Sequence, residues 1–248
     1  MQRQGTPHFD LPGLPSYFGG KGSQAAFRRI INALPPHRVY IEAFGGSLRI
    51  MRHKMPAPDG NHALELDPTV FKLYPHSTLG GYTFHCGDAF TILPDLVSQY
   101  LRHGQAASDI LVYVDPPYLL HTRRNSRPAY SFEFHQGDHE LLASHLQRLS
   151  CRVVLSHLPC PEYSALYHSW HTFTFQNATR HGPQTEQVWC NYAPTVDLHE
   201  YTFVGDNKRH REQIRRHFGV ILRRAAKLPP SARVALAAAL EGLNQRVG

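Results

Sequence analysis

The pattern of apolar and polar positions alternates, over most of the chain, between short apolar runs and longer amphipathic stretches. The short runs predict strands at 39–44, 62–66, 82–86, 109–114, 151–157, 171–176 and 186–192. The amphipathic stretches predict helices at 23–34, 46–55, 90–104, 135–149 and 161–170. This alternation favours a doubly wound α/β sheet with right-handed crossovers, in which ligands bind at the carboxyl ends of the strands.

The last part of the chain departs from this pattern. Residues 205–248 predict two helices interrupted by Pro229 and Pro230, and the first of these helices is strongly basic. We therefore expect a main domain at 1–204 and a basic helical C-terminal extension at 205–248.

Charge and composition narrow the class of protein. The formal net charge of +7 favours polyanionic partners, nucleic acid before an anionic membrane surface. We expect a cytoplasmic protein, because neither a membrane-spanning apolar run nor a signal-peptide pattern is present.

No metal site is expected, because the 18 histidines show no paired ligand spacing. The widely spaced cysteines are expected to be reduced core residues: Cys86, Cys151, Cys160 and Cys190.

The segment Asp115-Pro116-Pro117-Tyr118 directly follows the apolar run at 109–114. An aromatic amino group is a poor nucleophile because its lone pair is delocalised into the ring. Two acceptors aimed at its hydrogens, the Asp115 carboxylate and the Pro116 carbonyl, would free that lone pair. Tyr118 offers a ring face to a base flipped out of a duplex. An ordinary turn that closes a strand would contain the same residue types.

Four further segments stand at expected strand ends or ahead of the first helix. Glycine turns let a backbone approach a ligand, and an acid about 20 residues later suits ribose hydroxyls. The residues concerned are Tyr17, Gly19, Gly20 and Lys21, then Glu42, Phe44, Gly45, Gly46 and Ser47, then Glu65, and finally Asp88 with Ala89. Taken singly, Glu65 also suits a helix-capping or solvated acid, and Asp88 a helix N-cap.

In this order the motifs Y-F-G-G-K, E-A-F-G-G-S, E-L-D, C-G-D-A-F and D-P-P-Y resemble the Dam-type DNA adenine methyltransferase family. The resemblance covers roughly residues 15–195 and extends to Leu155-Ser156-His157 and to the run 186–192. It implies a class I, Rossmann-like methyltransferase fold with a seven-stranded sheet, and S-adenosylmethionine as cofactor.

The same resemblance implies a role for each motif. Residues 17–21 and 42–47 would hold the methionine part of the cofactor, Glu65 its ribose, and Asp88 with Ala89 its adenine. Asp115 would lie at the cofactor and, with Pro116, hold the target amino group. Pro117 completes that turn, and Tyr118 would stack on the base.

One departure from the family concerns target recognition. The family's recognition domain normally lies between the ribose-binding acid and the third-strand motif, where this chain has only residues 67–85. We therefore expect a short or relaxed DNA target site. Its contacts are expected from the basic residues of the loop after Tyr118 and of the C-terminal extension: Arg123, Arg124, Arg127, Lys208, Arg209, Arg211 and Arg215.

Other functions remain open at this stage. An RNA adenine methyltransferase could share the D-P-P-Y motif, and a catalytically silent methylase fold could bind nucleic acid without turnover. Cytosine amino-group enzymes usually resemble this chain with Ser in place of Asp115, and glutamine methyltransferases with Asn there.

Overall fold

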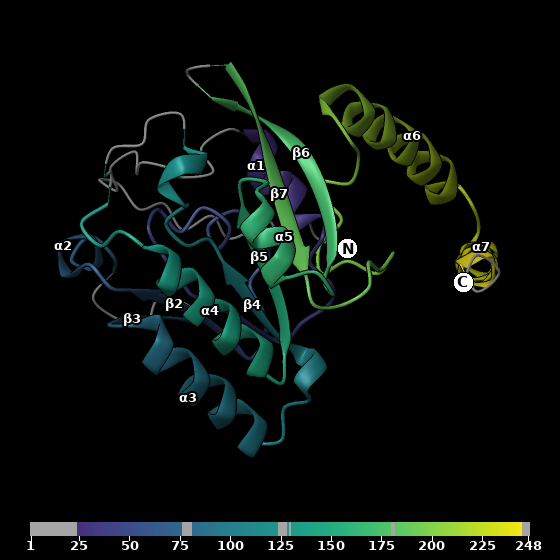
Figure 1. The fold of residues 1–248 in the computed structure, drawn as a ribbon. Helices are drawn as coiled ribbons and strands as arrows, with labels where there is room; N and C mark the ends of the chain where they lie inside the picture. The colour runs from purple at the N-terminus through teal and green to yellow at the C-terminus, as the bar shows by residue number, and fades with distance from the viewer. Residues whose placement is uncertain (1–23, 76–80, 124–127, 129, 180–181, 245–248) are drawn as a thin grey trace. The chain divides into compact units, whose positions relative to one another are not determined.

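The computed structural model describes residues 24–75, 81–123, 128, 130–179 and 182–244 (Figure 1). The chain forms two compact units, residues 1–202 and residues 203–248. No helix among the described residues is long and apolar enough to cross a membrane.

A single seven-stranded sheet forms the centre of the first unit. Its strands are β1 (Val39–Glu42), β2 (Gly60–Glu65), β3 (Tyr82–Cys86), β4 (Ile110–Val114), β5 (Arg152–His157), β6 (His171–Thr179) and β7 (Gly182–Cys190). The spatial order is β3-β2-β1-β4-β5-β7-β6. The five strands from β3 to β5 pair in parallel, whereas β7 pairs antiparallel with both neighbours. This arrangement confirms the expected class I, Rossmann-like methyltransferase fold.

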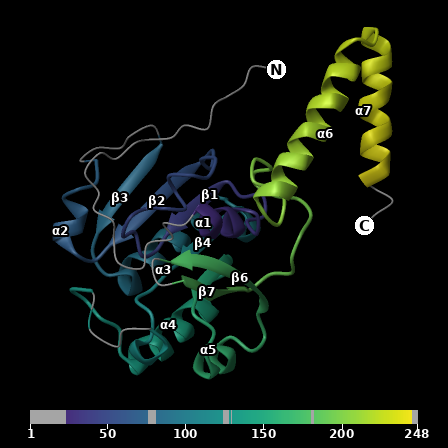
Figure 2. The ribbon, with the colours of Figure 1, turned by 90° about the horizontal axis from the view of Figure 1, so that it is seen from above.

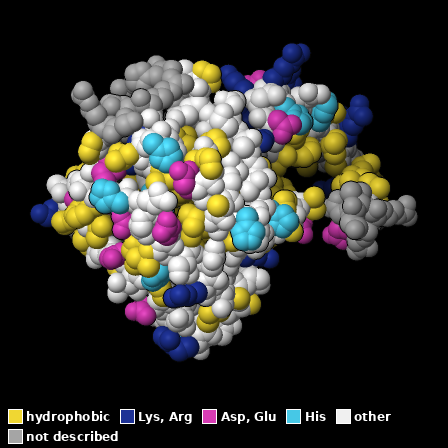
Figure 3. All heavy atoms as spheres, in the orientation of Figure 1, with side chains coloured by type: hydrophobic (Ala, Val, Ile, Leu, Met, Phe, Trp, Pro, Cys, Tyr) yellow, Lys and Arg dark blue, Asp and Glu magenta, His cyan; other side chains and the backbone are white. Residues whose placement is uncertain are grey.

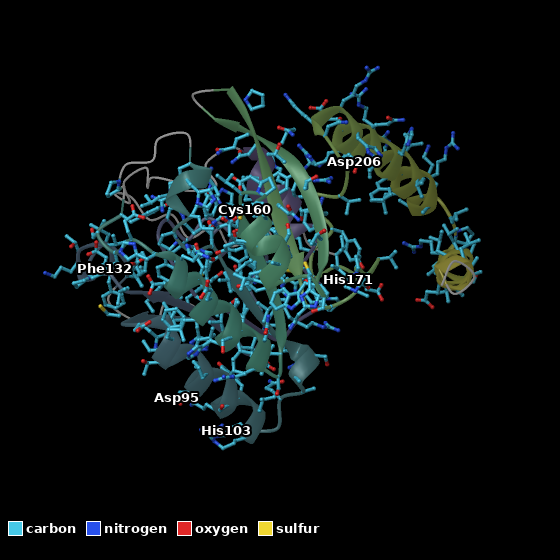
Figure 4. All side chains as sticks on the ribbon, viewed as in Figure 1. Asp95, His103, Phe132, Cys160, His171 and Asp206 are labelled. Carbon is cyan, nitrogen blue, oxygen red and sulfur yellow. The ribbon has the colours of Figure 1, made fainter. Side chains whose placement is uncertain are left out.

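Helices cover both faces of the sheet (Figures 1 and 2). On one face lie α3 (Ala89–Arg102), α4 (Gln136–Arg148) and α5 (Pro161–Leu166), and on the other lies α1 (Gln24–Ile31). Three short helices complete the connections: α2 (Pro68–Phe71), η1 (Ala107–Asp109) and η2 (Leu120–Thr122). The side chains of Asp95 on α3 and of His103 directly after this helix point away from the sheet (Figure 4).

The main core follows the alternation of side chains along each strand. Ile110, Val112 and Val114 of β4 share one buried cluster with apolar residues of α3, α4 and α5. Leu111 and Tyr113, between them, are equally buried but point to the opposite face. Because β4 is covered on both faces, it is apolar at every position, as its sequence predicted.

The predicted helix at 46–55 is wrong, because this segment forms a series of turns. Gly46 has a φ of 48° and Leu48 a φ of 53°, both in the left-handed region that a right-handed helix cannot contain. Smaller differences concern ends and short elements. Helix α5 stops at Leu166, β7 begins at Gly182, and α2 was not predicted at all.

The second unit contains the two helices expected at the C-terminus, α6 (Lys208–Ala226) and α7 (Pro230–Asn244). The Asn207 side chain caps α6 by accepting a hydrogen bond from the backbone N–H of His210 at 2.9 Å. Pro230 is the first residue of α7, a position where its missing N–H costs no helical hydrogen bond.

Cysteines and histidines lie in many different parts of the described chain. All four cysteines are free thiols, and Cys151, Cys160 and Cys190 are buried as predicted. Cys86 is exposed, so its assignment to the core was wrong. Histidines are scattered over the face seen in Figure 3. Within the described part of the chain, no three His, Cys, Asp or Glu side chains form a group that could hold a metal ion.

Trp189 generates a stability prediction. Its side chain is 1% exposed and packs against Tyr163 of α5 and Tyr167 just after this helix, with ring centroids 5.4 Å and 6.3 Å away. We expect Trp189→Ala to lower the free energy of unfolding by about 3–5 kcal/mol, because it leaves a large cavity in the core. Urea denaturation followed by circular dichroism measures this loss. Val196→Ala, at a side chain that is 87% exposed, is the control and should stay close to wild type.

Candidate active site

A cavity of about 310 Å³ lies at the carboxyl ends of β1, β2 and β4. It brings together eleven of the residues singled out from the sequence: Glu42, Phe44, Gly45, Gly46, Ser47, Glu65, Asp88, Ala89, Asp115, Pro116 and Pro117. Tyr118 does not line it, and Tyr17, Gly19, Gly20 and Lys21 lie outside the described residues. The segment 130–138 also contributes to the wall, which the sequence did not predict.

The glycine turn after β1 is tied to the neighbouring strand. The Gly45 N–H donates to the carbonyl of Leu64 at 2.7 Å, which draws the turn against the end of β2. A Cβ on Gly45 would lie 2.5 Å from the Tyr74 hydroxyl and 3.1 Å from the Leu64 carbonyl oxygen. The turn therefore needs glycine here because of the close approach, and the backbone forms the floor of the cavity.

Glu65 links this turn to the chain after β2. Its Oε2 accepts from the Gly46 N–H at 2.8 Å, and its Oε1 accepts from the Asp67 N–H at 2.9 Å. The Tyr74 hydroxyl donates to the Gly46 carbonyl at 2.8 Å on the same side. Although only 8% exposed, the carboxylate lines the cavity, where it can accept further hydrogen bonds. Glu65 is therefore not the solvated acid that its sequence also allowed.

Glu42 is a buried carboxyl group at the end of β1. Its Oε2 accepts hydrogen bonds from the Met51 N–H at 2.8 Å and from the Tyr40 hydroxyl at 3.1 Å. Burial raises the pKa of Glu42 to about 8, although these two hydrogen bonds lower it. Lys54 lies near it, over the ring of Tyr40, and burial lowers the pKa of this amine to about 7. The pair thus forms a weakly charged layer behind the glycine turn.

Asp88 and three phenylalanines form the far wall. Asp88 is the N-cap of α3, where it accepts from the Phe90 N–H at 2.9 Å, and it also lines the cavity. The Phe90 and Phe134 rings stack at 15° with centroids 5.9 Å apart, and Phe44 meets Phe134 edge-on at 5.6 Å. This wall offers a planar ligand apolar surface beside one acidic acceptor.

Asp115, at the end of β4, is held by two hydroxyl groups. Its Oδ1 accepts from Ser156 Oγ at 3.0 Å and from the Tyr118 hydroxyl at 3.1 Å. The Tyr118 ring lies 4.5 Å from the ring of His157, and its hydroxyl also meets Glu186 Oε2 at 2.9 Å. The D-P-P-Y segment is therefore not a simple turn, because its acid and its phenol share one hydrogen-bond network with β5 and β7.

The loop after Tyr118 is fastened by its first arginine. Arg123 forms a bidentate ion pair with Glu133, at 2.9 Å and 2.6 Å, and its guanidinium lies over the Tyr130 ring. The side chain is only 6% exposed, so this arginine holds the segment that lines the cavity. A nucleic-acid contact of Arg123 stays a prediction, and a phosphate would have to compete with Glu133 for this largely buried guanidinium. Arg124 and Arg127 lie outside the described residues.

The basic residues predicted on α6 divide into two kinds. Lys208, Arg209 and Arg215 are exposed. Arg211 is 8% exposed and donates to the Gly205 carbonyl at 3.3 Å, so it stabilises the start of the helix. Lys208 and Arg216 lie 3.9 Å and 4.0 Å from Glu212, which neutralises only part of this basic face.

No family model matches the chain, and no curated protein sequence is similar to it. Several solved structures are similar in fold. A candidate S-adenosylmethionine-dependent methyltransferase from Streptococcus mutans is 12% identical, with a TM-score of 0.41, over 66% of this chain and 47% of that one. The chain thus spans about half the length of that protein.

Two other similar structures match over more of their own length. A candidate RNA methyltransferase from Pyrococcus horikoshii is 13% identical over 66% of this chain and 79% of that one, with a TM-score of 0.41. A second candidate methyltransferase from Streptococcus mutans, solved in complex with SAH, is 10% identical over 66% and 94%, with a TM-score of 0.39. The strand order of the sheet defines the fold class, and contacts within this chain define the site.

Glu42 generates a prediction about pH. With its pKa raised to about 8, Glu42 keeps its proton in the folded state, whereas the unfolded chain releases it near the ordinary value of 4.5. The free energy of unfolding of the wild type should therefore fall as pH rises from 4.5 to about 8. Glu42→Gln has no proton to release, so we expect it to gain stability over wild type by up to a few kcal/mol across that window.

Chemical denaturation at several pH values measures the difference. Lys54 contributes the opposite slope above its pKa of about 7, and its charge interacts with that of Glu42, so the two proteins are compared below that pH, where Lys54 is protonated. A stability difference that does not change with pH would show that Glu42 is ionised in the folded protein.

Proposed function

We propose that this protein transfers a methyl group from S-adenosylmethionine to the exocyclic amino group of adenine in DNA. One observation carries the proposal. A carboxylate held by two hydroxyls, Asp115, stands at the rim of the same cavity that the glycine turn and Glu65 line. An acceptor for an amino group and a site for a nucleoside therefore meet at one edge of the sheet.

The described residues suit the cofactor in size and chemistry. The cavity of about 310 Å³ is within the usual range for a small-molecule site, and it joins acidic acceptors to an aromatic wall. We propose that Glu65 accepts from the ribose hydroxyls, that Asp88 and Ala89 flank the adenine, and that the turn beside Glu42 holds the methionine part. A cofactor bound there supplies an electrophilic methyl group on a sulfonium.

The residues at the end of β4 act on the target amino group. Asp115 accepts one of its hydrogen atoms and the Pro116 carbonyl the other, so that the nitrogen lone pair turns toward the methyl donor. The Ser156 and Tyr118 hydroxyls fix the carboxylate before the base arrives. This preorganisation is the main contribution that the chain makes to the rate.

DNA is the proposed substrate because the chain is basic and exposes cationic side chains on α6. A base inside a duplex must be flipped out to reach Asp115. The same site could act on an adenine in RNA, so each assay of methyl transfer is run on both nucleic acids. Adenine methylated only in RNA would replace the proposed substrate but keep the proposed chemistry.

The first prediction for this function concerns Asp115. We expect Asp115→Ala to lower methyl transfer at least about a hundredfold, because a preorganised acceptor for the amino group is lost. Affinity for S-adenosylmethionine should largely persist, since the glycine turn and Glu65 are intact. Mass spectrometry of N6-methyladenine in digested DNA measures the first quantity, and calorimetry the second.

Glu65→Ala is the complementary variant. It should weaken cofactor binding by about 1–3 kcal/mol, because a charged acceptor is lost. Turnover by Asp115→Ala at the wild-type rate would refute the proposed role of this carboxylate, whereas unchanged cofactor affinity in Glu65→Ala would remove Glu65 from the ribose site.

The second prediction concerns α6. Replacing Lys208, Arg209 and Arg215 with Ala should weaken DNA binding equally for all sequences, because phosphate contacts carry no sequence information. The slope of log affinity against log salt should shrink by about one unit for each cation that no longer pairs with a phosphate. Fluorescence anisotropy at several salt concentrations measures both effects.

A triple variant of the first unit controls for net charge. Lys72, Arg102 and Arg148 are also exposed, and replacing them with Ala removes the same number of positive charges. If both triple variants lose affinity to the same extent, the effect reflects overall charge, and α6 does not bind the DNA.

A further inference from the structure

The Tyr118 hydroxyl stands between two carboxylates. Its oxygen lies 3.1 Å from Asp115 Oδ1 and 2.9 Å from Glu186 Oε2. A phenol has only one proton, so it can donate to only one of these acids at a time. The second acid therefore completes the arrangement best when it carries a proton and donates that proton to the phenol oxygen. The three groups form a chain along which one proton can move.

Glu186 lies on the same face of β7 as the buried Val188 and Cys190. It is only 3% exposed, on β7, and its Oε1 accepts from the Asn177 amide at 3.2 Å, across the pair with β6. A buried carboxylate is costly unless it is hydrogen-bonded. Here both of its oxygens have partners, and one of these partners belongs to the D-P-P-Y segment, 68 residues away in the chain.

Other ionisable side chains lie near Glu186. Among the described residues they include Asp115, Tyr118 and Tyr113, and the His157 ring packs on Tyr118. Burial raises the pKa of Tyr113 well above its usual value, and the negative charges of Asp115 and Glu186 add to this, so Tyr113 stays a neutral phenol.

We propose that Glu186 is the terminal proton acceptor of the methyl-transfer reaction, reached from Asp115 through the Tyr118 hydroxyl. This inference rests on the proposed function, because it needs a target amino group at Asp115. It gives a role in the reaction to a residue of β7, the last strand in chain order among the described residues.

Protons and charges balance over one methyl transfer, at the end of which Glu186 holds the proton. The amino nitrogen forms a bond to the methyl carbon while the bond from that carbon to the sulfonium sulfur breaks. In the same step an N–H bond breaks, and its proton passes to Asp115. Asp115 gives a proton to the Tyr118 oxygen as Tyr118 gives its own proton to Glu186. The sulfonium charge and the Glu186 charge are both lost, and Asp115 and Tyr118 return to their starting states.

Three substitutions at Glu186 separate proton uptake from mere positioning. Gln keeps an oxygen that accepts from Tyr118 but cannot take up a proton, whereas Asp keeps the carboxylate on a shorter side chain. We expect Glu186→Gln to lower the single-turnover rate of methyl transfer about a hundredfold, the usual scale for a lost general base. Glu186→Asp should retain more activity than Glu186→Gln. Glu186→Ala should be no more active than Glu186→Gln.

Tyr118→Phe tests the path. It removes the hydroxyl but keeps the ring, and it should cause a similar loss. If both groups act in one relay, the double variant Tyr118→Phe/Glu186→Gln should be no slower than the slower single variant. Glu140→Gln is the matched control, because it removes a carboxylate on the exposed side of α4 and should leave the rate unchanged.

The experiment uses the full chain with DNA and RNA, and binding of S-adenosylmethionine is measured for each variant to confirm a folded site. A wild type active on either nucleic acid, with Glu186→Gln at the wild-type rate, overturns the relay but leaves the proposed methyl transfer to adenine standing. Asp and Gln variants that are equally slow also overturn it, because the role would then be one of shape. A wild type inactive on both nucleic acids overturns the proposed function and the relay together.

Discussion

The pairing of β1 with both β2 and β4 is the constraint on which the site depends. Because the three strands are parallel and in register, Glu42 lies beside Ala63 on one side and Tyr113 on the other. The acids that follow these strands, Glu65 and Asp115, are thereby brought to the same edge of the sheet. The pairing of the strands is thus enough to bring together segments that are distant in sequence.

Around this edge the chain places polar groups where water is largely excluded. Glu42, Glu65 and Glu186 are each less than a tenth exposed, and each accepts hydrogen bonds from a backbone amide or a side chain of another segment. Such groups stabilise a fold only when they are satisfied. Hydrogen bonds therefore link the glycine turn to the end of β2 through Glu65, and separately link Asp115 to β5 and β7 through Ser156, Tyr118 and Glu186.

The sequence predicted the strands well because a buried parallel strand is apolar along its whole length, as in β4. The glycine turn, Glu65 and Asp115 were found because they stand at the end of such strands or directly after them. The segment 46–55 was mistaken for a helix because apolar spacing does not reveal a left-handed residue such as Leu48. Arg123 looked like a surface cation because its partner, Glu133, is ten residues away in a segment without periodicity.

Glu186 shows a different limit. A charged residue in an alternating strand is normally assigned to the solvent side, and only the fold brings it to Tyr118. Its membership of the D-P-P-Y network could not have been inferred from spacing, because the two residues belong to elements that become neighbours only through the antiparallel addition of β7 to the sheet.

The close approach of Gly45 and Tyr74 has a consequence for how this site can change over evolutionary time. The phenol of Tyr74 occupies the space that any larger residue at position 45 would need, and the same phenol fastens the turn through the Gly46 carbonyl. Neither position can be altered alone without a clash or a loosened turn. Descendant sequences should therefore exchange the two residues jointly, so that a smaller side chain at 74 accompanies any departure from glycine at 45.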